Sequence, residues 1–163
     1  MSARFLFPAL ALAALPLGVA SAEVPAGPAH VSPDGSVTVQ MPCANPRSME
    51  PEGFPSEVLV CWESEALYLY TFRVDPDGAG AFERVLSEMA DNAFTQVEEG
   101  TLGGKRVAVA TQASVDGGGM VRVIEIAPDT VAFAAVGRPQ LTWASNDDAR
   151  KASAFVNSLK VVD

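Results

Sequence analysis

Residues 66–74 (ALYLYTFRV) decide the fold of this chain. Along them Tyr68, Tyr70 and Phe72 fall on one side of an extended segment, and Leu67 and Leu69 fall on the other. Aromatic residues favour strands, and a strand that is apolar on both faces is typical of the interior of a sheet. We therefore expect this segment to be a strand with a neighbour on each edge.

The residues on either side of this strand predict a hairpin and a helix. Residues 57–63 (EVLVCWE) precede it across a turn near Ser64 and Glu65, so the two segments form a hairpin. A second turn, 75–78 (DPDG), ends it. The period of apolar residues then changes from two to 3.6, which predicts an amphipathic helix that covers one face of the sheet; its apolar stripe is Phe82, Val85, Leu86, Met89, Ala90 and Phe94.

Three more strands are predicted at 105–112, 120–127 and 130–137, joined by short glycine- or proline-containing turns. Such short connections require antiparallel neighbours. The segment 131–136 (VAFAAV) is apolar on both faces, so we place it in the middle of the sheet. We expect a first strand at 36–41, an irregular Pro-rich excursion at 42–55, and a short polar strand or extended linker at 95–99.

A second helix is predicted near the C-terminus. Ser145 and Asp148 fit a capping box at its start, and Ala152, Phe155 and Leu159 belong to its buried side. Residues 160–163 close the chain as a possible small extra strand. We predict one α+β domain over 34–163, a single antiparallel sheet of about six to seven strands with two amphipathic helices.

Residues 1–22 are predicted to be a cleavable signal peptide. Arg4 is followed by an uncharged apolar run over 5–20, and Ala20-Ser21-Ala22 supplies small residues before a cleavage site. The run is shorter than the ~20 residues of a spanning helix, and no other segment is long and apolar enough to span a bilayer. We expect a periplasmic or secreted protein with no integral membrane segment after cleavage, and a flexible leader at 23–33.

The charge of the chain excludes one class of partner. The whole chain has a formal net charge of −9, and removal of residues 1–22 leaves 10 basic and 20 acidic residues, a charge of −10. Such a surface repels nucleic acid, so nucleic-acid binding is excluded. It favours basic partners or cations, although high charge also serves simply to keep an exported protein soluble.

Cys43 and Cys61 are the only cysteines. One pair in an oxidising compartment favours a structural disulfide, and two free thiols are the alternative. Their spacing does not fit a redox motif, and no cysteine or histidine cluster supports a zinc site. Trp62 follows Cys61, and we expect it to pack across the bridge; a contact residue is the alternative.

No catalytic residue, metal site or cofactor is predicted. The only histidine, His30, falls in the leader and is expected to be exposed. The Gly-rich loop at 116–119 joins two strands and lacks a helix N-terminus for a phosphate. The turn at 75–78 resembles the start of a calcium loop, but the twelfth position is Leu86, so weak adventitious calcium binding is the most it allows. The paired carboxylates Glu63/Glu65, Glu98/Glu99 and Asp147/Asp148 are expected to be solvated charges.

Arg138 and Trp143 are the candidate binding residues. They lie in 137–144 (GRPQLTWA), between the central strand and the last helix. Loops on a rigid scaffold often carry function, and Trp and Arg are enriched at binding hot spots. The alternative for Trp143 is that it folds back over the N-terminus of the last helix.

The element order resembles the PsbP-like sandwich, a fold of photosystem extrinsic subunits and small bacterial envelope proteins. The resemblance is carried by 37–42 (VTVQMP), the aromatic strand at 68–72, 102–107 (LGGKRV) and 155–160 (FVNSLK). It implies a largely non-enzymatic protein that acts through protein contacts, and it supplies no catalytic residues.

Three functional hypotheses follow. The first is a non-enzymatic exported accessory protein that binds a protein partner in the cell envelope through its acidic surface and loops. The second is a periplasmic domain that binds a small ligand or cation in a cleft between the sheet and a helix. The third is a hydrolase that uses carboxylates alone.

Overall fold

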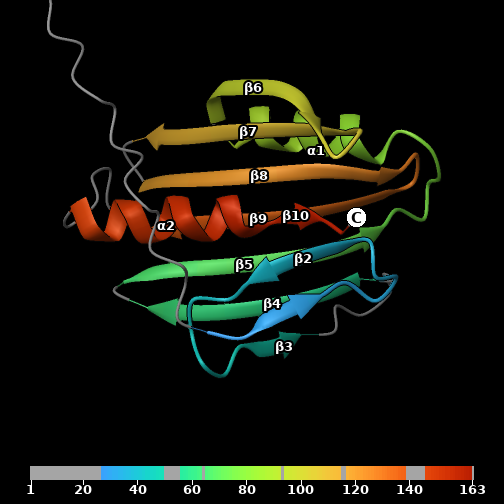
Figure 1. Ribbon diagram of the computed structural model, residues 1–163. Coiled ribbons are helices and arrows are strands. Elements are labelled where there is room, and N and C mark those ends of the chain that lie inside the picture. The colour runs from blue at the N-terminus through green and yellow to red at the C-terminus, as the bar shows by residue number, and fades with distance from the viewer. Residues whose placement is uncertain are drawn as a thin grey trace, which may run out of the picture.

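The computed structural model describes residues 27–49, 56–63, 65–92, 94–114, 117–138 and 146–162. Within these residues the chain folds into two sheets and two helices (Figure 1). The elements are β1 (Ala29–Val31), β2 (Val37–Gln40), β3 (Arg47–Met49), β4 (Ser56–Glu63), β5 (Ala66–Val74), α1 (Ala81–Asp91), β6 (Phe94–Leu102), β7 (Lys105–Ser114), β8 (Gly117–Ala127), β9 (Thr130–Arg138), α2 (Asn146–Ser158) and β10 (Lys160–Val161). More than half of the described residues lie in strands, so the fold is mostly β with a smaller helical part.

The prediction of a single sheet is wrong. The strands form a seven-stranded sheet in the order β3-β4-β5-β9-β8-β7-β6 and a three-stranded sheet in the order β1-β2-β10. β2, expected as the first strand of one sheet, pairs instead with β1 and β10. Its buried Val37 and Val39 alternate with half-exposed Thr38 and Gln40. A strand with this alternation fits either sheet equally well. A period of two shows which side chains are buried, but it does not show which strands are neighbours.

The interior position of β5 is confirmed. It pairs along its length with β4 on one edge and with β9 on the other, both antiparallel. β9 in turn lies between β5 and β8, as expected for a strand that is apolar on both faces. β5 and β9 are neighbours in the sheet, although α1, β6, β7 and β8 lie between them in the sequence.

Segments expected to be irregular contain strands. β1 lies inside 23–33, so the prediction of a flexible leader is wrong for Ala29–Val31, because pairing with β2 outweighs the effect of its composition. β3 lies inside the Pro-rich excursion. β6 is nine residues long and pairs with β7, more than the short strand or linker expected at 95–99. The small extra strand at the C-terminus is confirmed as β10.

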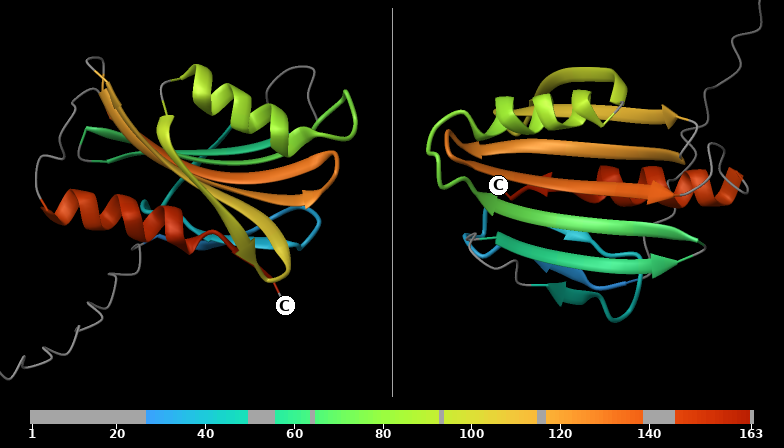
Figure 2. Two further views of the ribbon diagram at one scale, coloured as in Figure 1. Left: turned by 90° about the horizontal axis from the view of Figure 1, so that it is seen from above. Right: turned by 180° about the vertical axis from the view of Figure 1, so that it is seen from behind.

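The two faces of the seven-stranded sheet are covered differently. α1 lies on one face, and α2 and the three-stranded sheet lie on the other (Figure 2, left). On the α1 face, Phe82 and Val85 pack with Val121 and Val123 of β8. The other face holds the larger core, which includes Val37, Val39, Met41, Tyr68, Tyr70, Phe155 and Leu159.

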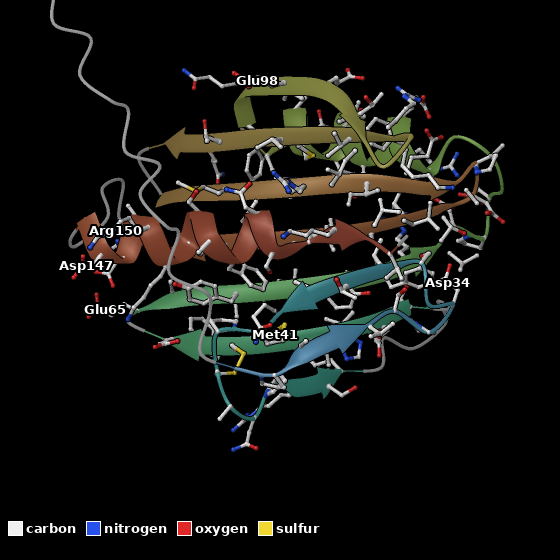
Figure 3. The ribbon with its side chains drawn as sticks, viewed as in Figure 1. Asp34, Met41, Glu65, Glu98, Asp147 and Arg150 are labelled. Carbon is white, nitrogen blue, oxygen red and sulfur yellow. A yellow bond between two sulfur atoms is a disulfide. The ribbon has the colours of Figure 1, made fainter. Side chains whose placement is uncertain are left out.

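A disulfide joins Cys43 to Cys61, which confirms the predicted bridge. Cys43 follows β2 and Cys61 lies in β4, so the bond links the small sheet to the large one. Figure 3 shows it close to Met41, which is buried in the same core. No helix in the described part of the chain is both long and apolar enough to cross a bilayer. The predicted signal peptide at 1–22 and the capping residue Ser145 lie outside the described residues.

Candidate functional site

One face of the seven-stranded sheet is covered by a helix over only part of its width. α1 packs on this face against β6, β8 and β9. In the view from behind, no described element lies in front of β5, β4 and β3 (Figure 2, right). Six apolar side chains from these three strands belong to the uncovered part, which we name the apolar strip: Met49, Val58, Val60, Trp62, Leu67 and Leu69.

The register of the strands places the apolar strip on the same side as α1. Leu69 lies opposite Ala135 of β9, and Ala135 packs against the core beneath α1. Directly opposite residues on antiparallel neighbours share a face. Val60 lies opposite Leu69, and Trp62 lies opposite Leu67, so β4 continues the face that starts under α1.

Trp62 is the most exposed large apolar side chain of this strip. Its relative exposure is 70%, whereas that of the preceding Cys61 is 2%. Because successive side chains of a strand point to opposite faces, the tryptophan lies on the side away from the disulfide. The expectation that Trp62 packs across the bridge is therefore wrong. Met49 of the edge strand β3 is also exposed, at 56%.

A cleft lies beside the apolar strip, between α1 and the sheet. Its volume is about 170 Å³, and its apolar lining comes from Val85, Met89, Phe94, Val121, Phe133 and Ala135. Ala135 is the register partner of Leu69, so the cleft and the strip adjoin. Together they form one apolar surface that runs from α1 to the edge of the sheet.

The charges around this surface differ from those of the whole chain. Among the residues that β3, β4 and β5 place on this face are two arginines, Arg47 and Arg73, and no acidic residue. Arg73 is held by Glu88 of α1 at 3.3 Å and by Asp75 at 3.2 Å. Arg47 is exposed and forms no ion pair with another described residue. The apolar strip thus carries one arginine, Arg47, without an ion-pair partner among the described residues, on a protein of net charge −9.

Of the two candidate binding residues from the sequence, the structure describes only Arg138, which lies apart from this surface. Arg138 is the last residue of β9, where it is 6% exposed and lies opposite Gly118 of β8. Its positive charge partly offsets the rise in the pKa of Tyr68, which burial and the nearby Glu63 raise to about 12. Trp143 lies outside the described residues. The structure therefore places Arg138 within the sheet.

His30 is not an exposed leader residue, so that expectation is wrong. Its Nε2 lies 2.9 Å from Oε2 of Glu57, and its ring contacts Tyr70 edge-on at a centroid distance of 5.4 Å. Burial raises the pKa of Tyr70, and the carboxylates of Glu57 and Asp34 add to this effect. Because His30 lies in β1 while Glu57 and Tyr70 lie in β4 and β5, these contacts join the two sheets.

The calcium-like turn at 75–78 is used for structure. Asp75 is buried and accepts hydrogen bonds from Nε of Arg84 at 2.8 Å, from Nη2 of Arg73 at 3.2 Å and from the backbone N–H of Asp77 at 2.9 Å. The hydrogen bond from Arg84 is the main cause of the lowered pKa of Asp75. Both carboxylate oxygens are therefore occupied by the protein. Across the described ranges, no group of three or more His, Cys, Asp or Glu residues is placed to hold a metal ion.

Four of the paired carboxylates lie apart from this surface: Glu63, Glu98, Glu99 and Asp147. Glu98 and Glu99 are exposed on β6, at the opposite edge of the sheet, and Glu98 is labelled there in Figure 3. Asp147 lies in the first turn of α2, on the other face. Glu63 ends β4, and its Oε1 lies 3.9 Å from Nζ of Lys151 in α2.

The apolar strip was missed by the sequence analysis, although one signal for it exists. Val58, Val60 and Trp62 alternate with Leu59 and Cys61, so 57–63 is apolar on both faces, like 66–74. A strand of this kind that lies near an edge, with one face outside the core, indicates a contact surface. No protein-family model matches this chain, and no curated protein matches it.

Proposed function

We propose that the chain is an exported, non-enzymatic accessory protein that acts by binding another protein through the apolar strip. The observation that carries this proposal is the 70% exposure of Trp62 within a row of apolar side chains that no described element covers. Trp62 and Met49 are exposed there, and Val58, Val60, Leu67 and Leu69 are half-buried between them. Exposed apolar side chains gathered on one face mark candidate interaction sites, and tryptophan is enriched among binding hot spots.

Two observations support export. Residues 1–22 have the composition of a cleavable signal peptide. The bond between Cys43 and Cys61 is of the kind that forms and persists outside the reducing cytoplasm. The resemblance to PsbP-like proteins stays a prediction, and it implies the same mode of action through protein contacts.

A small apolar ligand in the cleft beside α1 is the second candidate, and the cleft itself is the observation that favours it. Its volume of about 170 Å³ is small compared with the ~300–1,000 Å³ typical of ligand sites. The cleft also adjoins the wider apolar strip, which a small molecule would leave uncovered. A protein partner accounts for both parts of the surface, so we favour it.

Site-specific photo-crosslinking in the native host tests the proposal. A photoreactive phenylalanine analogue replaces Trp62 on the strip in one strain and Arg150 in a control strain. Arg150 is exposed on α2, on the other face of the sheet (Figure 3). We expect the same protein adduct in repeated experiments from position 62 and none from position 150. Equal adducts from both positions, or none from position 62, would contradict the proposal.

The export part has a separate test. Mass spectrometry of the envelope fraction should find the chain beginning at Glu23, with Cys43 linked to Cys61 in the non-reduced sample. Recovery of the full-length chain from the cytosol, with two free thiols, would contradict export and leave the crosslinking result to be judged by itself.

A further inference from the structure

We infer that the partner segment on the apolar strip is a single amphipathic helix that lies alongside α1 and carries carboxylates on the side that faces Arg47. This inference rests on the proposed function and names the partner chemistry of the same site. Three properties of the strip lead to it: its dimensions, the shortness of the neighbouring edge strand, and its charge.

The dimensions of the strip match one helix. β3, β4 and β5 are consecutive in the sheet, and strands lie ~4.8 Å apart, so the strip is ~10 Å wide. The eight residues of β4 extend over ~26 Å at ~3.3 Å per residue. A helix with its side chains is ~10–12 Å across, and about 15 residues cover ~22 Å. α1 already occupies the neighbouring part of this face in the same way.

The same dimensions disfavour a second copy of this chain. A strip of this size has a projected area of ~250 Å², whereas a stable dimer buries ~800 Å² on each partner. Two copies would also bring together two chains that each have a net charge of −9.

An added strand at the edge is disfavoured as well. The edge strand β3 is three residues long, Arg47–Met49, so it offers few backbone groups to a new neighbour. A strand added at that edge would extend the sheet and leave Trp62 and Leu69 uncovered. Only an element that lies on the face buries these side chains, as in helix-in-groove recognition.

Charge complementarity indicates acidic residues on one side of the helix. Next to α1, Arg73 is already neutralised by Glu88 and Asp75. At the other side of the strip, Arg47 is opposite Val60 and has no ion-pair partner among the described residues. A carboxylate on the flank of the docked helix that faces β3 would pair with Arg47. The apolar side chains of the helix would cover Trp62 and Leu69 and reach the cleft at Ala135.

The test uses the full chain in its native host and identifies the segment of the partner that is crosslinked from position 62. We expect that segment to have apolar residues spaced three and four apart, flanked by Asp or Glu. Arg47→Glu should lower the yield of this adduct at least fivefold, whereas Arg47→Lys should retain most of it. Arg150→Glu changes the net charge by the same amount on the other face of the sheet and should leave the yield unchanged.

Several outcomes would overturn the inference. One is an adduct with a second copy of the chain, with lipid or with an extended segment. Another is a yield of the protein adduct that Arg47→Glu leaves unchanged. A reproducible protein adduct that fails these criteria overturns the helix and leaves the proposed function standing. The absence of any adduct from position 62 overturns the proposed function itself, so the two failures are distinguishable.

Discussion

Removal of the Cys43–Cys61 bond should destabilise the whole domain, because the bond joins the two sheets. Cys43 follows β2 of the small sheet, and Cys61 is a buried residue of β4 in the large sheet. The perturbation is the double replacement Cys43→Ala and Cys61→Ala. It removes the covalent link. The pairing of β2 with β1 and β10, and of β4 with β3 and β5, stays in place.

The expected magnitude comes from the separation of the two cysteines. They are 18 positions apart, and closing a loop of that length in the unfolded chain corresponds to about 3 kcal/mol in the chain-entropy account. A loss of this size lowers the ratio of folded to unfolded protein by about 10²-fold. The urea m-value should also rise, because the unfolded chain without the link is more expanded.

Urea unfolding followed by far-ultraviolet circular dichroism measures this effect. Three samples are compared: the oxidised wild-type chain, the same chain in dithiothreitol, and the double variant. The reduced chain and the double variant should agree, and both should lose about 3 kcal/mol relative to the oxidised chain. A loss below about 1 kcal/mol would refute the reasoning that the bond acts by constraining the unfolded chain.

Three other predictions concern buried groups. Arg84 holds the pKa of Asp75 below its usual 3.8, so the Asp75 carboxylate stabilises the fold above that pH and the effect is lost as the pH falls. Asp75→Asn should therefore lower the melting temperature more at pH 7 than at pH 3, whereas Asp77→Asn, at an exposed position, should leave the melting temperature unchanged at both pH values. Burial is the main cause that raises the pKa of Tyr68 to about 12, so Tyr68 stabilises the fold below pH ~10 and loses this effect at higher pH. Tyr68→Phe should therefore flatten the decline of the unfolding free energy at alkaline pH, and an unchanged decline would contradict this. Phe82 is fully buried beneath Arg106, 4.4 Å from its ring centroid, so Phe82→Ala should lower the free energy of unfolding by about 4 kcal/mol in urea; a loss below about 1 kcal/mol would show that the core under α1 does not depend on it.

Part of the candidate site could be predicted from the sequence, and part could not. The apolar residues of 57–63 are visible in the sequence, and so is the position of this segment in a hairpin with 66–74. The position of α1 on the sheet decides which face of that hairpin stays uncovered. In the sequence α1 follows β5 after a turn and is connected to β7 through β6. The buried side of the helix packs with side chains of β6, β7, β8 and β9 and does not extend over β4. No local pattern in the chain specifies that limit.

The sequence by itself determined the type of most elements, the interior positions of β5 and β9, and the one intramolecular pairing open to its two cysteines. These follow from local causes, because side-chain alternation, helical periodicity and turn residues act over a few positions, and two cysteines allow one intramolecular pair. Only the tertiary structure decided that β2 joins β1 and β10 in a second sheet, that His30 contacts Glu57 and Tyr70, and that Trp62 points to an uncovered face. Each of these depends on contacts between segments distant in the chain, and the choice among such contacts is made by the packing of the whole domain.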